Sequence, residues 1–383
     1  MTPFDYQPRT RIVFGPGKIE ALGELASELG ARRALVVSDP GVIAAGHTAK
    51  GLAALERAGI EAHLFEGVHE NPTTEDVAAG ARLARRYDPE ILIGLGGGSS
   101  MDCCKGINFV FTNGGEVKDF WGVGKALKAM LPMIAVPTTA GTGSETQSFA
   151  LISDAKTHVK MACGDKKAAC RIALLDPELT ISQPPRITAL TGIDALSHAL
   201  ETFVTSRRNP VSLAFSRESW RLLAGNFARV LTNPDDLDAR GSMLLGASFA
   251  GLAIENSMLG AAHALANPLT TNFDVPHGQA VGVMLPHVIR YNAAAVEHQY
   301  HDLLHESQNG SPLPKLAGGV SGLADFVAAM LAKAGLATTL RPLGIDPRKF
   351  PLLATQATKQ WTATFNPRTP TEEDFLALYQ QAY

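Results

Sequence analysis

Residues 91–102 read ILIGLGGGSSMD, an apolar run that ends in glycines and serines. The apolar residues are typical of a buried strand, and the residues after the glycines predict the start of a helix. Glycines let the backbone come close to a pyrophosphate, and the free amides at a helix N-terminus attract its negative charge. This stretch therefore favours phosphate binding over a plain turn, which is the alternative for any glycine run.

Short apolar runs alternate with helical patterns on both sides of this stretch. Strand-like runs lie within residues 11–17, 32–39, 61–68, 91–100 and 131–141, and helical patterns lie within 19–30 and 47–59. Strands separated by helices pair in parallel, so we expect a doubly wound, mostly parallel sheet whose ligands bind beyond the carboxyl ends of the strands. After Pro184-Pro185 nearly every pattern is helical. We therefore predict an α/β dinucleotide-binding (NAD-binding) domain over residues 1–183 and an all-α, metal-binding domain over 184–383.

Two further loops at expected strand ends carry groups that suit a dinucleotide. Asp39 can accept hydrogen bonds from ribose hydroxyls and would repel a 2′-phosphate, so it favours NAD over NADP; an ordinary Asp-Pro-Gly turn is the alternative. Residues 137–145, PTTAGTGSE, suit a phosphate or the nicotinamide ribose, although such loops are also common linkers. In the hairpin expected within residues 149–163, Lys160 either reaches the cofactor or faces solvent.

A candidate metal site begins in residues 191–201, TGIDALSHALE, where Asp194 and His198 lie four residues apart in a helical pattern. Such residues share a helix face, with Cβ atoms roughly 5–6 Å apart. His263 lies in a helical pattern that we expect to run through residues 241–269, and His277 follows a proline-marked loop. One carboxylate and three imidazoles favour Fe²⁺ or Zn²⁺ over Ca²⁺ or Mg²⁺. Hydrogen-bonded core histidines are the alternative.

The composition is that of an ordinary globular protein, because 45% of the 383 residues are hydrophobic, 19% are charged and the net charge is −3. This charge gives no reason to expect nucleic acid or an anionic membrane as a partner. The cysteines form no C-x-x-C pair, so packing in a reduced, cytoplasmic protein is the simpler interpretation. The first residues lack the apolar run of a signal peptide, and no segment reaches the ~18 apolar residues of a membrane span.

Taken in order, GGGSSMD, PTTAGTGSE, TGIDALSHALE, His263 and PHGQAVGVMLPH resemble the iron-containing (group III) alcohol dehydrogenases, the family of lactaldehyde reductase and 1,3-propanediol dehydrogenase. The resemblance covers nearly the whole chain and implies homodimers or larger homo-oligomers. The metal ligands that it implies are Asp194, His198, His263 and His277. The NAD contacts that it implies are Asp39, Asn71, Gly97, Gly98, Ser99, Asp102, Thr138, Thr139, Thr142 and Lys160.

One departure from the family pattern concerns the substrate pocket. Many members carry a second histidine four residues after the third ligand, where this chain has Asn267. An asparagine can form hydrogen bonds but cannot titrate near neutral pH. A cysteine that is often found before the NPR motif is also absent, with Thr362 in that vicinity. The expected pocket residues, which are largely apolar or neutral, are Phe149, Ile254, Asn267 and Thr362.

The resemblance implies reversible hydride transfer between a small, uncharged primary alcohol or diol and NAD, with Fe²⁺, or alternatively Zn²⁺, as Lewis acid. We expect His277 and Asn267 to act in catalysis. Alternatives are a glycerol dehydrogenase, a dehydroquinate synthase-like lyase and a non-catalytic nucleotide sensor. The lyase would need several cations around an anionic substrate, and residues 241–289 contain no Lys or Arg.

Overall fold

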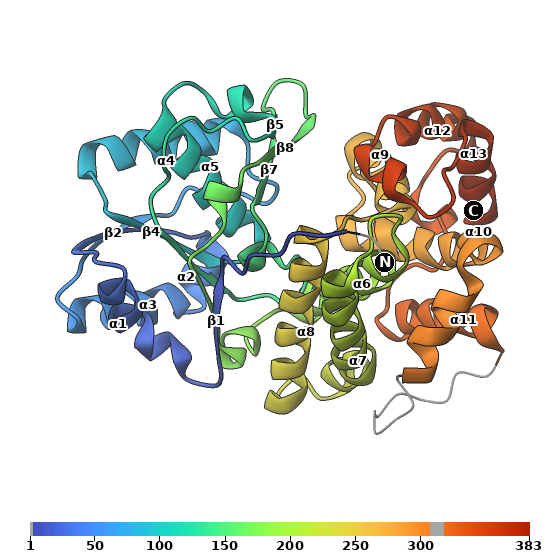
Figure 1. The fold of residues 1–383 in the computed structure, drawn as a ribbon, viewed down its shortest axis with the longest axis horizontal. Coiled ribbons are helices and arrows are strands. Elements are labelled where there is room, and N and C mark those ends of the chain that lie inside the picture. The colour runs from blue at the N-terminus through green and yellow to red at the C-terminus, as the bar shows by residue number, and fades with distance from the viewer. Residues whose placement is uncertain (1–2, 307–317) are drawn as a thin grey trace. The chain divides into compact units, whose positions relative to one another are not determined.

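The computed structural model describes residues 3–306 and 318–383 and divides them into two compact units (Figure 1). One unit is Gln7–Gln183, and the other is Pro184–Tyr383 together with the N-terminal segment up to Tyr6. The first residues thus belong to the helical unit, in contrast to the expected division. A physical reason is that the ring of Tyr6 lies 6.3 Å from that of Phe215, between ring centroids.

The α/β unit is built on a parallel sheet, as the alternation of strands and helices predicts. Its strands, in spatial order, are β1 (Arg11–Phe14), β9 (Ile172–Leu175), β6 (Met133–Pro137), β4 (Ile91–Gly96), β2 (Arg33–Val37) and β3 (Glu61–Phe65). A smaller sheet contains β5 (Gly122–Val123), β8 (Lys160–Gly164) and β7 (Phe149–Ser153). Strands β7 and β8 pair antiparallel and form the predicted hairpin.

Helices cover both faces of the parallel sheet, which makes it doubly wound (Figure 1). These helices are α1 (Leu22–Glu28), α2 (Pro40–Ala44), α3 (His47–Arg57), α4 (Thr74–Tyr87) and α5 (Gly98–Asn113). Helix α4 begins at a capping box, in which Thr73 and Asp76 satisfy each other's backbone amides, and it ends where Asp88 turns left-handed. Both ends are thus determined locally.

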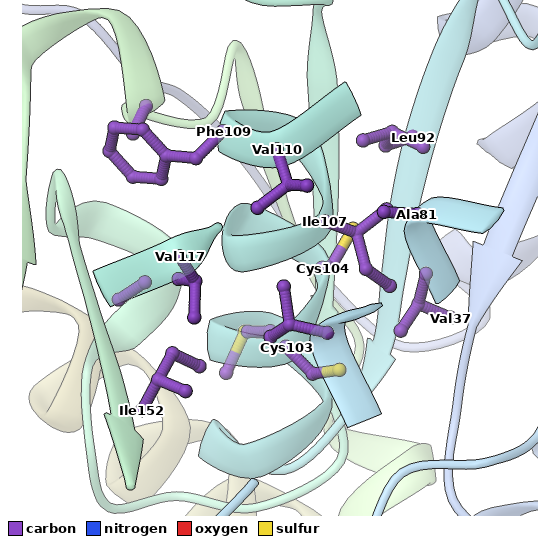
Figure 2. Close-up of a cluster of buried hydrophobic side chains, with 14 of the residues drawn as sticks. Val37, Ala81, Leu92, Cys103, Cys104, Ile107, Phe109, Val110, Val117 and Ile152 are labelled. Atoms are coloured by element: carbon purple, nitrogen blue, oxygen red, sulfur yellow. The ribbon is translucent and has the colours of Figure 1, made fainter. Parts of the chain in front are cut away.

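Helix α5 forms the centre of the hydrophobic core between the parallel sheet and the hairpin (Figure 2). Its adjacent Cys103 and Cys104 are both fully buried, and Cys163 and Cys170 complete a set of buried, free thiols. Burial raises the pKa of Cys163 and that of Cys170 to about 11 each. The thiols are therefore protonated at neutral pH and pack as small apolar side chains.

In the described residues of the second unit, all regular secondary structure is helical. Its helices are α6 (Pro185–Val204), α7 (Pro210–Thr232), α8 (Leu237–Glu255), α9 (Ala261–Phe273), α10 (His277–Glu306), α11 (Gly319–Lys333), α12 (Phe350–Thr358) and α13 (Glu372–Gln381). Helix α6 packs against α7, α8 and α10, and α10 also packs against α9 and α11. In the part of the chain that the structure describes, no helix combines the length and apolarity needed to cross a membrane.

The unbroken helix expected over residues 241–269 is wrong, because the chain leaves the helix between α8 and α9. Asn256 and Ser257 stand at the break and hydrogen-bond back to the carbonyls of Leu252 and Ala253. Such side chains compete with helical backbone bonds, and glycine, here Gly260, is a poor helix former. The break places His263 in the first turn of α9 instead of the middle of a long helix.

Helices α6 and α10 approach so closely at Gly278 that no side chain fits there. A Cβ at this position would overlap the backbone carbonyl of Leu190 on α6. We expect Gly278→Ala to lower the stability by roughly 2 kcal/mol, as overpacking does, and to lower the melting temperature by several degrees. Differential scanning calorimetry measures this change. In the control Gly51→Ala, the new methyl meets the tips of Leu95 and Leu22 side chains, which can rotate. A Gly278→Ala melting temperature no lower than that of Gly51→Ala would contradict the prediction.

Candidate metal centre and cofactor site

Three helices of the second unit bring one carboxylate and three imidazoles together. Asp194 and His198 lie on α6, His263 lies in the first turn of α9, and His277 is the first residue of α10. The Nε2 atoms of His198, His263 and His277 lie 3.4, 3.6 and 3.7 Å from the Oδ1 atom of Asp194. Asp194, His198 and His263 are buried, while the side chain of His277 is 28% exposed.

These separations fit a divalent ion better than a hydrogen-bonded cluster. In a tetrahedral site, bonds of 2.0–2.2 Å from Zn²⁺ to nitrogen and oxygen place neighbouring ligand atoms about 3.3–3.6 Å apart. Within the described residues, Asp194 Oδ1 and His263 Nε2 are buried and make no hydrogen bond. Leaving such atoms without a partner is costly, and an ion would satisfy both. The donor atoms of Asp194, His263 and His277 also lie within 4.8 Å of one another.

The charges in the cluster favour the form of Asp194 that binds metal. Burial opposes ionisation of Asp194, but His198 and the other two imidazoles outweigh burial, so the pKa of Asp194 lies well below its usual range. Burial also disfavours a charged His263, but the carboxylates of Glu201 and Asp194 outweigh burial and raise the pKa of His263 to about 9. A bound cation would take the place of the proton that these carboxylates attract.

Glu201 is a member of this centre that ligand spacing alone does not indicate. It lies seven residues after Asp194 on α6 and is 4% exposed. Its Oε2 lies 2.6 Å from Nδ1 of His263, the ring nitrogen that faces away from Asp194. The sequence does contain a signal for Glu201. It lies two helical turns after Asp194, on the same face of a largely apolar helix, where a carboxylate needs a partner.

In the α/β unit, the glycine-rich turn and the threonine-rich loop lie side by side. Strands β4 and β6 pair so that Gly96 stands opposite Pro137, and the two loops follow directly. A Cβ on Gly98 would come within 2.7 Å of the Thr142 side chain, and one on Gly97 within 3.4 Å of Thr139. Gly97 caps α5 without a side-chain hydrogen bond, so the first amides of this helix are available to an anion.

Other predicted cofactor residues surround the start of α5. Asp39 accepts hydrogen bonds from the Val42 amide at 3.1 Å and from the Ser100 hydroxyl at 2.9 Å. Asn71 adopts a left-handed backbone conformation, with φ of 53°, and its backbone N–H donates to the Ser99 hydroxyl. Lys160 Nζ donates to Asn71 Oδ1 at 3.5 Å. The structure thus gathers the Asp39, Asn71, Ser99 and Lys160 side chains at one helix end.

Asp102 and Thr138, two more of the predicted cofactor residues, are also held by hydrogen bonds within the chain. The Asp102 carboxylate accepts hydrogen bonds from the Ser144 hydroxyl at 2.6 Å and the Leu151 amide at 3.1 Å. Burial raises the pKa of Asp102 above its usual value, although Lys105 opposes this effect. Thr138 is 5% exposed, and its amide donates to the Gly96 carbonyl. Direct contact with NAD stays a prediction for these two residues, as it does for the other predicted cofactor residues.

Three of the predicted pocket residues lie in the helical unit. Asn267 follows His263 by one turn of α9, and its Nδ2 donates to Gln360 Oε1 at 2.9 Å. Thr362 is buried in a 3-10 helix, Trp361–Phe365, that packs against α9. Ile254 is buried in the last turn of α8, and Phe149 lies on β7 of the other unit.

Residues 8–177 match the family profile described as iron-containing alcohol dehydrogenase, and residues 188–383 match that of the C-terminal part of the Fe-containing alcohol dehydrogenase family. The chain is 35% identical to 1,3-propanediol dehydrogenase of Klebsiella pneumoniae, covering 99% of each chain. It is 31% identical to an NAD-dependent methanol dehydrogenase of Bacillus methanolicus, covering 100% of each. A crystal structure of a 1,3-propanediol oxidoreductase aligns with a TM-score of 0.94 at 34% identity, again over 100% of both chains.

Replacing Asp194 tests whether the cluster holds metal. We expect Asp194→Asn to weaken divalent metal binding by more than the roughly 10–100-fold that loss of an outer-shell partner costs. The reason is that the carboxylate is the point on which all three Nε2 atoms converge. Titration with Zn²⁺ against a chelator measures the affinity. The control His298→Ala removes an exposed imidazole from α10 and should have no effect. Equal affinity in Asp194→Asn and His298→Ala would refute the site.

Proposed function

The chain belongs to the iron-containing alcohol dehydrogenase family, and from this we propose that it catalyses reversible hydride transfer between a small primary alcohol or diol and NAD. It is an NAD-dependent alcohol and aldehyde oxidoreductase of the metal-dependent kind. The observation that carries the proposal is the convergence of three imidazole Nε2 atoms on Asp194 Oδ1, at 3.4–3.7 Å. The relatives named 1,3-propanediol dehydrogenase and NAD-dependent methanol dehydrogenase support the reaction class.

Asp194, His198, His263 and His277 would hold the metal ion. When bound there, the ion supplies a Lewis acid that polarises the substrate oxygen. One carboxylate with three imidazoles suits both Fe²⁺ and Zn²⁺, and the family description supports Fe²⁺ as the native ion. The chain holds these side chains on three packed helices, so the donor atoms are in place before the ion arrives.

The α/β unit would hold NAD. The backbone amides at the start of α5 would bind its pyrophosphate. Thr139 and Thr142, in the neighbouring loop, lie next to these amides. Asp39 would accept hydrogen bonds from the adenosine ribose and exclude a 2′-phosphate. Lys160 stands next to Asn71, where it would contribute positive charge near the cofactor.

The substrate would be a small, uncharged alcohol or aldehyde. Residues 241–289, which include two of the proposed ligands, contain no Lys or Arg that could bind an anionic group. The polar side chain one turn after His263 is the neutral amide of Asn267, paired with the neutral amide of Gln360. Because an amide does not titrate near neutral pH, the alcohol proton would leave through water or the ribose hydroxyls.

We also place the enzyme in the cytoplasm as a homodimer or a larger homo-oligomer. The support for a reduced compartment is that its four cysteines are buried free thiols. Light scattering coupled to size-exclusion chromatography measures the oligomeric state.

The function is tested with anaerobically purified protein that is loaded with Fe²⁺ or Zn²⁺. Short primary alcohols and diols are offered with NAD or NADP, and formation of the reduced cofactor is followed by absorbance. We expect metal-dependent turnover with a preference for NAD. Binding of metal and NAD without turnover of any alcohol would favour a nucleotide sensor, and conversion only of a phosphorylated, carboxylated substrate would favour a lyase. Turnover of glycerol alone would favour a glycerol dehydrogenase.

Introducing a titratable group at Asn267 tests the proposed proton route. We expect Asn267→His to add an ionisation near pH 6–7, the usual range for an imidazole, to the pH–rate profile. The control Asn267→Gln also changes the contact with Gln360 but adds no titratable group. Identical profiles for Asn267→His and Asn267→Gln would rule out a role for this position in proton transfer.

A further inference from the structure

Helix α9, which carries His263, begins without a cap of its own. Its N-cap residue is Gly260, which has no side chain to accept hydrogen bonds from the first amides. Buried amides at a helix start need acceptors from elsewhere. Three consecutive amides, those of residues 260–262, are satisfied here by two side chains that lie far away in the sequence, Glu201 and Asn366.

Glu201 accepts most of these hydrogen bonds. Its Oε2 accepts from the Gly260 amide at 3.1 Å, and its Oε1 accepts from the Ala262 amide at 2.7 Å. The same Oε2 lies 2.6 Å from Nδ1 of His263. An ionised carboxylate only accepts hydrogen bonds, so Nδ1 is the donor and carries the proton. Nε2 of His263 faces Asp194, so once a metal displaces its proton the Nε2 lone pair is directed toward the metal centre.

Asn366 connects the same turn to α10, the helix that carries His277. Its Oδ1 accepts from the Ala261 amide at 3.2 Å and from Asn292 Nδ2 at 3.1 Å. Its Nδ2 donates to Asn292 Oδ1 at 2.7 Å and to the Arg368 carbonyl at 2.6 Å. Both Asn366 and Asn292 are buried, at 2% and 1% exposure. The amide pair therefore fixes the start of α9 relative to α10.

We propose that Glu201 and Asn366 are positioning residues that hold the first turn of α9 so that His263 offers Nε2 to the metal centre. Neither residue is itself a ligand. The inference rests on the proposed metal-dependent function and adds to it the residues that connect the three ligand-bearing helices. Glu201 ties α6 to α9, and Asn366 ties α9 to α10. The glycine at 260 belongs to this arrangement, because a Cβ there would lie 2.9 Å from Asn366 Oδ1 and 3.1 Å from Glu201 Oε1.

The main test replaces the Glu201 carboxylate and measures metal binding without alcohol or NAD. We expect Glu201→Gln to weaken Zn²⁺ binding roughly 10–100-fold. Glutamine has one acceptor oxygen in place of two, so its NH₂ group would face either the Ala262 amide or the Gly260 amide and His263 Nδ1, all of which need an acceptor. The visible spectrum of the Co²⁺-substituted protein should also change, since it reports the geometry of the ligands. NAD affinity, which depends on the other unit, should be unchanged.

The control separates positioning from simple capping. Asp236 caps α8 by accepting from the Ala239 amide, and it makes an exposed ion pair with Arg229. Asp236→Ala should therefore lower the melting temperature by a few degrees without changing Zn²⁺ affinity or the Co²⁺ spectrum. If Glu201→Gln lowers the melting temperature like Asp236→Ala but keeps wild-type Zn²⁺ affinity, Glu201 is only a helix cap and the proposal fails.

A second variant decides the question if Glu201→Gln does not fold. Gly260→Ala removes no polar group but pushes against both Glu201 and Asn366, so it should weaken Zn²⁺ binding in the same direction. Wild-type affinity in a folded Gly260→Ala protein would overturn the proposal. A wild-type protein that binds Zn²⁺ but oxidises no alcohol would remove the proposed function and leave the positioning role intact.

Discussion

The helical unit depends on a buried negative charge, the carboxylate of Asp194. A carboxylate that is 5% exposed on a largely apolar helix is costly unless charge or hydrogen bonds compensate it. Imidazoles on three helices surround it, each with Nε2 within 3.7 Å of the same oxygen, and a cation bound among them would supply the compensation. The close approach of α6 and α10 at Gly278 serves the same end, because it brings His277 to the carboxylate.

In the α/β unit, a buried positive charge, that of Lys105, also organises the residues around it. Lys105 on α5 is fully buried, and its Nζ donates to the Ser144 carbonyl, the Ser144 hydroxyl and the Phe149 carbonyl at 2.6–2.9 Å. The Ser144 hydroxyl in turn donates to Asp102. These bonds hold the loop that carries Thr142 against the start of α5. Buried hydrogen bonds in the domain core therefore determine the shape of the expected cofactor site.

The two buried charged groups, Lys105 and Asp194, differ in how their hydrogen-bonding capacity is satisfied. The ammonium of Lys105 is satisfied by the chain itself, with backbone and hydroxyl acceptors around it. The Oδ1 atom of Asp194 has no hydrogen-bond donor within the described residues. Internal satisfaction is typical of a structural role, whereas a charged atom that the chain leaves unsatisfied among convergent lone pairs is typical of a site that takes a ligand.

The sequence by itself determined the parallel sheet, the glycine turn before α5 and the pairing of Asp194 with His198, because each follows from local spacing along one strand or helix. The tertiary structure alone decided where His263 and His277 lie relative to that pair, and that α8 and α9 are separate helices. It also brought the side chains of Glu201 and Asn366 to the backbone amides at the start of α9, about 60 and 105 residues away in the sequence. Local periodicity carries information over one or two helical turns. Contacts between distant segments depend on how whole helices pack, which no local pattern encodes.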